Sequence, residues 1–191
     1  MPPTPSKIVI VTAPSGAGKT SITRHLLERL PRLAFSVSAT TRPRRGTEVD
    51  GRDYHFIDPD TFRAHIADHA FLEWEMVYTD KYYGTLVSEV EAIWRQHRTP
   101  LLDIDVKGAL RVMADERVHS LSLFIQPPDI AALESRLRGR GTDSEASIRD
   151  RLAKAETELS FRDRFDRTVV NDDLPRACRE AEDIVRAFLD A

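Results

Sequence analysis

The sequence predicts a three-layer α/β/α fold, a single domain over residues 1–191 in which helices cover both faces of a parallel sheet. Four apolar runs, at residues 7–12, 100–105, 120–125 and 167–171, have the length and continuity of buried parallel strands. Helical patterns separate these runs, and that alternation is typical of strand–helix–strand units. A chain of this length can bury a core of its own.

The first predicted helix, at residues 19–30, follows the first strand after one short loop. Ile22, Leu26 and Leu30 recur with helical spacing on one face, and Pro31 ends the helix. A helix directly after a buried strand places the loop between them at the carboxyl edge of the sheet, where α/β proteins bind their ligands.

Caps and periodicity predict the remaining helices. Asp58 and Asp129 each precede a helical pattern as an N-cap does, and Thr142 with Glu145 has the spacing of a capping box. The expected helices run over 59–69, 86–97, 106–113, 129–138 and 175–189. A further helix is expected from the capping box through the apolar face of 148–159.

Residues 36–88 differ in pattern from the rest of the chain. Short strands are expected at 35–39, 54–57 and 71–77, together with one helix and a polar, arginine-rich loop at 40–53. We therefore predict an inserted subdomain of mixed strands that projects from the parallel core.

The stretch TAPSGAGKT, residues 12–20, directly follows the first strand and opens the first helix. It matches the phosphate-binding pattern G-x-x-x-x-G-K-[ST] except that Ala13 stands at the first glycine. Alanine is tolerated there if its φ is negative, because the close approaches to phosphate fall along residues 16–18. In such a loop, hereafter the P-loop, backbone N–H groups surround the phosphates. Lys19 would bridge the terminal phosphates and Thr20 would hold Mg²⁺.

Composition narrows the remaining function classes. The formal net charge of -3 and the pI near 6.1 give no reason to expect a nucleic-acid or membrane-surface partner. The single cysteine, Cys178, excludes a disulfide framework. The opening MPPTPSK lacks the apolar core of a signal peptide, and no apolar run approaches a membrane span. We expect a soluble, cytoplasmic protein with small-molecule ligands and no obligate protein partner.

Several further motifs occur together with matching spacing: FSVSATTRPRRGTEVDGRDYHF, FLEWEMV, YYGT, LLDIDVKGA, RLRGRGTDSEASIRDRL and VVNDDL. With them, the chain from Ile8 to its end resembles the guanylate kinases in unbroken order. The resemblance implies ATP-dependent phosphorylation of GMP, and of dGMP, within purine nucleotide metabolism. It also implies that residues 36–88 bind GMP and that residues 126–160 form a helical lid.

The chemistry of the residues agrees with a monophosphate acceptor. Two arginines on the polar loop, Arg42 and Arg45, suit a phosphate dianion, because a guanidinium can bind two of its oxygens at once. Tyr54 and Tyr83 would add neutral donors. Arg44 lies between the two arginines but does not match the family spacing, so we expect it to face solvent.

Guanine presents two adjacent donors, N1–H and the N2 amino group, and one carboxylate can accept both. Glu73 matches the family's guanine-reading glutamate, while Glu75, which points the same way along an alternating strand, is its rival within the sequence. The resemblance assigns the following residues to GMP: Ser38, Arg42, Arg45, Tyr54, Glu73, Tyr83, Thr85 and Asp103.

The P-loop and the resemblance together assign an ATP site: Ala13, Pro14, Ser15, Gly16, Ala17, Gly18, Lys19, Thr20, Ser21, Arg136, Arg140 and Asn171. The resemblance assigns catalysis to Lys19, Arg42, Arg136, Arg140 and Arg151, and the Mg²⁺ site to Thr20 and, through water, Asp105. The lid arginines would close over the transferring phosphoryl group when the nucleotides bind. The family usually has glycine where Thr47 stands, so the turn after Arg45 is expected to use Gly46.

Two other function classes share parts of this pattern. A P-loop kinase acting on a sugar phosphate would keep the P-loop and the lid but would not need Glu73, Ser38 and Thr85. A non-catalytic module resembling guanylate kinase would typically lack the P-loop lysine or the lid arginines, which this chain has. The sequence therefore favours an active kinase.

Overall fold

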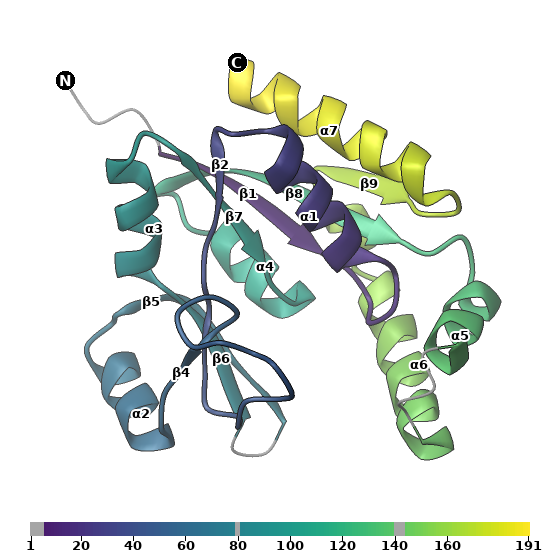
Figure 1. Cartoon of the computed structure of the whole chain (residues 1–191), viewed down its shortest axis with the longest axis horizontal. Coiled ribbons are helices and arrows are strands. Elements are labelled where there is room, and N and C mark those ends of the chain that lie inside the picture. Colours follow the sequence, from purple (N-terminus) through teal and green to yellow (C-terminus); the bar gives the residue numbers. More distant parts are fainter. Residues whose placement is uncertain (1–5, 79–80, 140–143) are drawn as a thin grey trace.

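A five-stranded sheet runs through the centre of the molecule in the order β2-β7-β1-β8-β9 (Figure 1). This computed structural model describes residues 6–78, 81–139 and 144–191. The strands of this core sheet are β1 (Ser6–Thr12), β2 (Leu33–Phe35), β7 (Thr99–Asp103), β8 (Val118–Gln126) and β9 (Arg167–Val170). Neighbouring strands are all parallel, which confirms the predicted fold class.

The central strand β1 supplies side chains to both faces of this sheet. Val9 and Val11 belong to one hydrophobic cluster, and Ile8 and Ile10 belong to another. The first cluster includes residues of α1 (Lys19–Arg29) and α7 (Leu174–Asp190), and the second includes residues of α3 (Val87–Arg95) and α4 (Val106–Met113). All four β1 side chains are fully buried, and each contributes about 1.5–3 kcal/mol to folding.

A second sheet, in the order β4-β3-β6-β5, is built from the segment that the sequence predicts as an insertion. The strands of this sheet are β3 (Ala39–Thr40), β4 (His55–Phe56), β5 (Phe71–Tyr78) and β6 (Lys81–Leu86), and the same segment contains helix α2 (Pro59–Ala67). Parallel and antiparallel pairs both occur, as expected for mixed strands. Figure 1 shows this sheet and α2 at the lower left, and α5 (Ile130–Gly139) and α6 (Glu145–Leu159) at the lower right.

The prediction of one strand over 35–39 is wrong, because this stretch contributes to two sheets. Phe35 ends β2, and the N–H of Ser36 makes a last hydrogen bond to the Leu101 carbonyl, 3.0 Å away. The chain then crosses to the second sheet, where the carbonyl of Ser38 accepts from the N–H of His55. The alternating sequence suits an extended chain but does not show where that chain changes partners.

Two predicted helix caps are confirmed and one is wrong. The carboxylates of Asp58 and Asp129 each accept the backbone N–H three residues on, as N-caps do. The N-cap of α6 is Ser144, whose hydroxyl accepts the N–H of Ser147 at 3.2 Å, and not Thr142, which lies outside the described residues. None of the helices in the described ranges is long and apolar enough to cross a membrane.

Candidate active site

The P-loop forms the turn between β1 and α1. Gly16 and Gly18 have φ of 95° and 98°, a left-handed backbone that favours glycine. Ala13 is buried in the core and is not among the described residues with positive φ, so its side chain is accommodated as expected. Every residue assigned to the loop from 13 to 21 except the buried Ala17 lines one cavity of about 310 Å³.

Asn171, which directly follows β9 (Arg167–Val170), contacts the P-loop from the same carboxyl edge of the sheet. Its buried Nδ2 donates to the Ala17 carbonyl at 2.7 Å. A Cβ on Gly18 would come within 2.2 Å of this Nδ2, so the contact itself requires glycine at that position. Arg136 of α5 donates from Nη2 to the Asn171 carbonyl, and its other terminal nitrogen is buried without a hydrogen-bond partner among the described residues.

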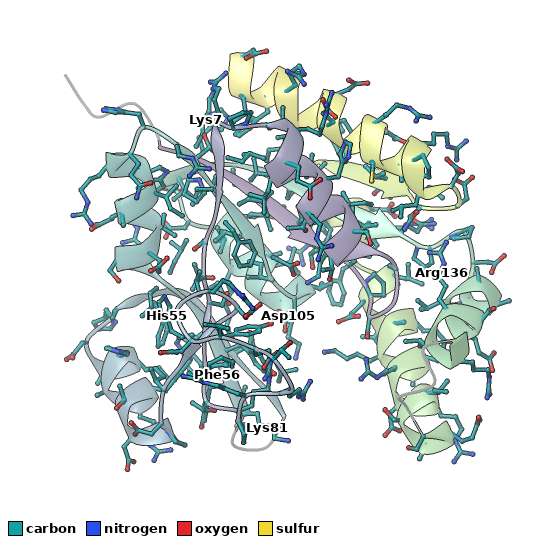
Figure 2. All side chains as sticks on the ribbon, viewed as in Figure 1. Lys7, His55, Phe56, Lys81, Asp105 and Arg136 are labelled. Carbon is teal, nitrogen blue, oxygen red and sulfur yellow. The ribbon has the colours of Figure 1, made fainter. Side chains whose placement is uncertain are left out.

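Lys19 and the carboxyl end of β7 meet beside the P-loop. The Lys19 ammonium forms an ion pair with Asp103 and donates to the Ile104 carbonyl at 3.3 Å. Asp105 caps α4, where its Oδ1 accepts the N–H of Gly108 at 2.8 Å. Figure 2 shows Asp105 in the middle of the molecule.

Thr20 and Asp105 line the same P-loop cavity. One hydroxyl and one carboxylate suit Mg²⁺ bound to nucleotide phosphates, because that ion keeps most of its ligands as phosphate oxygens and water. Among the described residues no three His, Cys, Asp or Glu side chains gather as a metal site of their own. The donor set therefore fits a metal carried in with a nucleotide.

Helix α6 brings Arg151, one of the arginines predicted to belong to a lid, to the P-loop. Arg151 donates from Nη1 to the Ser15 hydroxyl at 2.7 Å. Lys154 and Glu158, which the sequence analysis missed, line the P-loop cavity one and two helical turns further on. Their i, i+4 spacing places them on one side of the helix, and that pattern could have singled them out. The predicted lid residue Arg140 lies outside the described residues.

A second cavity of about 310 Å³ opens between the core and the second sheet. Most of the residues assigned to the acceptor line it. They are Ser38, Tyr54, Glu73, Tyr83 and Asp103, together with the P-loop residues Ser15 and Lys19. Burial raises the pKa of the Tyr54 phenol, which therefore stays a protonated donor at neutral pH.

Glu73 is the buried carboxylate of this second cavity, with 6% of its surface exposed. Glu73 and Thr85 are directly paired between β5 and β6, so the Thr85 hydroxyl donates to the Glu73 carboxylate at 2.6 Å. Burial, with smaller contributions from Asp105 and Glu75, raises the pKa of Glu73 to about 7. Gly108 leaves room for this carboxylate, because a Cβ there would lie 2.6 Å from it.

The rival Glu75 lines the same cavity but has a cationic partner. Its Oε1 lies 2.7 Å from an Nη of Arg111, which also donates to the Trp74 carbonyl at 2.7 Å. The two glutamates thus differ in environment, because Glu73 accepts a hydrogen bond from a hydroxyl and Glu75 forms an ion pair with a guanidinium.

The two arginines assigned to the acceptor phosphate have different environments. Arg42 is buried, and its Nε donates to the Tyr83 hydroxyl at 3.2 Å. Arg45 is exposed and does not line the second cavity, so the structure does not bring its side chain to the other acceptor residues. Arg44 is exposed as expected. The turn after Arg45 does use Gly46, whose φ is 52°.

A parallel sheet with a lysine-bearing, glycine-rich loop between β1 and α1 is the arrangement of the P-loop class of nucleotide-binding proteins. Comparison with known proteins identifies the family within this class, since the family model described as guanylate kinase matches residues 5–188. The curated guanylate kinase of Salinibacter ruber is 51% identical over 183 residues, which cover 95% of this chain and 96% of that one.

Two further relatives agree. The curated guanylate kinase of Bacteroides fragilis is 47% identical over 184 residues, covering 96% of this chain and 90% of its own length. The crystal structure of guanylate kinase from Anaplasma phagocytophilum has a TM-score of 0.77 and 30% identity, and the match covers 96% of this chain and 86% of that one. The chain therefore belongs to the guanylate kinase family.

The packing of Asn171 against the P-loop predicts the effect of a single methyl group. Gly18→Ala should destabilise the protein by about 1–3 kcal/mol, because alanine must adopt a left-handed φ and displace the Asn171 amide. Urea denaturation measures the change. Gly139→Ala, whose methyl meets no described residue within 4 Å at the end of α5, is the matched control and should be neutral or slightly stabilising. Equal stability of the two variants would contradict this account of the loop.

The raised pKa of Glu73 predicts a pH-dependent stability. The unfolded chain loses this proton near pH 4.5 and the folded protein near pH 7, so stability falls as the pH rises between those values. The loss should be on the order of 3 kcal/mol. Glu73→Gln cannot ionise and should escape it, so wild type should lose stability relative to the variant between pH 5 and pH 8. A difference that does not change with pH would show that Glu73 is not desolvated.

Proposed function

We propose that this chain transfers the γ-phosphoryl group of ATP to GMP, forming ADP and GDP. The observation that carries the proposal is the buried carboxylate of Glu73 in the second cavity, which the P-loop lysine Lys19 also lines. dGMP is proposed as a second acceptor, because none of the contacts proposed here uses the ribose 2′-hydroxyl. The proposed substrates and the single cysteine, Cys178, both fit the cytoplasm.

Base selection is assigned to Glu73 with Thr85. An ionised Glu73 can accept both guanine donors, whereas the same carboxylate would face the lone pair on N1 of adenine. The Thr85 hydroxyl fixes the orientation of the carboxylate through its 2.6 Å hydrogen bond. Ser38 and Asp103 line the same cavity and are proposed to complete the acceptor site.

The acceptor phosphate is assigned to Arg42, Tyr54 and Tyr83, and to Arg45, whose exposed side chain would have to turn inward when the nucleotide binds. Tyr54 and Tyr83 both line the second cavity, and Arg42 is linked to it through its hydrogen bond to Tyr83. Charge-assisted hydrogen bonds from guanidinium groups to phosphate are roughly twice as strong as neutral hydrogen bonds.

The donor nucleotide is assigned to the P-loop cavity. Its backbone N–H groups and Lys19 would hold the phosphates, and Thr20 and Asp105 would hold Mg²⁺, directly and through water. When bound, the ion would offset part of the negative charge of the phosphates. One buried nitrogen of Arg136 has no hydrogen-bond partner among the described residues, and it supports an anionic ligand beside Asn171, which contacts the P-loop.

The acceptor atom is a phosphate oxygen that is already deprotonated, so the reaction needs no general base. The protein's task is to align donor and acceptor oxygens and to offset their mutual repulsion. We assign this task to Lys19, Arg42, Arg136, Arg140 and Arg151. Residues 36–88 would act as the GMP-binding subdomain and residues 126–160 as the lid.

A coupled assay of ADP release with GMP, dGMP, AMP or ribose bisphosphate as acceptor tests the proposal. GMP and dGMP should be turned over, and the other two should not. Lys19→Ala should abolish turnover while the protein stays folded. Turnover of a sugar phosphate, or activity retained without Lys19, would overturn the assignment.

If Glu73 binds the guanine base, replacing one of its carboxylate oxygens should have a large effect on kcat/KM for GMP. Glu73→Gln replaces one acceptor oxygen with a competing donor, and the buried mismatch should lower kcat/KM for GMP by about 2–4 kcal/mol. That loss is roughly 30- to 800-fold. Glu75→Gln is the matched control and should change kcat/KM far less. If the control shows the larger loss, Glu75 reads the base.

The contact between Arg151 and Ser15 predicts a loss confined to the chemical step. Arg151→Met should lower kcat roughly 10²- to 10⁴-fold at saturating ATP and magnesium, with a much smaller effect on the KM for GMP. Steady-state kinetics would measure both constants. Arg149→Met, an exposed position on the same helix, should leave kcat unchanged. A rise in KM at constant kcat would make Arg151 an ordinary binding group.

A further inference from the structure

The guanidinium of Arg42 is already paired with a carboxylate from its own loop. Nη1 and Nη2 of Arg42 donate to the two oxygens of Glu48, each at 2.6 Å. The same carboxylate accepts the backbone N–H of Arg45 at 2.8 Å. Arg42 is 5% exposed and the Glu48 side chain 23%, so the pair lies at the edge of the protein interior with the acid on the outer side.

These contacts form an oxyanion site. A planar guanidinium binding two oxygens, with a backbone N–H beside it, is what a phosphate group also takes from a protein. The tyrosines assigned to the acceptor phosphate are close by. Tyr83 accepts from Nε of Arg42, and the Tyr54 ring centroid lies 4.9 Å from the Arg42 guanidinium carbon.

The guanidinium of Arg42 has few N–H donors left for a further ligand. A guanidinium has five N–H donors. Two go to Glu48, one to the Tyr83 hydroxyl and one to the Pro43 carbonyl at 2.9 Å. One N–H is left, so a phosphate cannot bind both terminal nitrogens while Glu48 holds them.

The Glu48 carboxyl is ionised at neutral pH. Its hydrogen bonds from Arg42 hold the pKa of the carboxyl at about 2. Two anions, this carboxylate and a nucleotide phosphate, would therefore be alternatives for one guanidinium.

We propose that Glu48 competes with the phosphate of the acceptor nucleotide, which binds Arg42 by displacing this carboxylate. The inference rests on the proposed function, since it takes Arg42 as the partner of that phosphate. The exchange leaves the buried guanidinium paired with an anion before and after binding. It also makes binding at this point depend on a charged phosphate, because a neutral ligand cannot replace a carboxylate.

Calorimetric titration of GMP and of guanosine, both without ATP, tests the exchange. Glu48→Gln replaces the competing anion with a neutral group and should tighten GMP binding about 5- to 30-fold. Guanosine has no phosphate and does not enter the exchange, so its affinity should stay within about twofold. Asp53→Asn is the matched control: Asp53 also pairs with an arginine, Arg52, and accepts a backbone N–H in the same loop. It should change neither affinity.

Weaker or unchanged GMP binding in Glu48→Gln would overturn the proposal. If Glu48 only orients Arg42, its removal should weaken GMP binding rather than tighten it. Equal shifts for GMP and guanosine would also overturn it, because they would indicate a general change in the loop. If Glu48→Gln does not fold, the same titrations on Glu48→Asp test the exchange. Its carboxylate is drawn back from Arg42, and it should tighten GMP binding about 2- to 5-fold, whereas weakening would count against the exchange. A wild-type protein that binds neither ligand would instead refute the proposed function.

Discussion

The hydrogen bond from Asn171 to the Ala17 carbonyl fixes the turn on which the rest of the site depends. The Asn171 backbone is itself held by the Gln126 carbonyl, so the end of β9 carries its side chain to the P-loop. Its amide occupies the space that a side chain on Gly18 would need, and the left-handed conformation of Gly18 sets the point at which α1 begins. Because Lys19 is the first residue of that helix, the direction of its ammonium group follows from a contact made at the far end of the chain.

Acidic side chains keep this site close to neutral without any ligand from outside. Lys19 pairs with Asp103, and Arg42 pairs with Glu48. Removing the partner of a buried cation destabilises a protein by about 3–5 kcal/mol, so pairing these cations with acids favours the folded protein. The same acids oppose the phosphates that the cations are proposed to bind. Arg136 is the contrast, since one of its buried nitrogens has no hydrogen-bond partner among the described residues.

Features set by local sequence could be predicted, and features set by distant partners could not. Continuous apolar runs and the P-loop motif were sufficient to predict the parallel core, because each depends on neighbouring residues. Strand β2 was missed because only three residues pair with β7, more than sixty positions later, before the chain leaves for the second sheet. Within the candidate site, residue types and approximate places were predicted. The pairing of Arg42 with Glu48 and the outward position of Arg45 were not, because a loop's internal contacts follow from its folded path.

The environments of the two cavity glutamates also explain why Glu73 suits a base with two donors better than Glu75 does. The charge on Glu75 is already offset by the nearby guanidinium of Arg111, so its ionised form gains less from a new donor. Glu73 accepts hydrogen bonds from Thr85, and burial makes its ionised form unfavourable. A ligand with two adjacent N–H groups relieves that desolvation by solvating the carboxylate, whereas a ligand with a lone pair there adds repulsion to it. In the proposed site, the unfavourable burial of Glu73 would therefore enlarge the difference between the two bases, because its ionised form gains more from two N–H donors and loses more beside a lone pair.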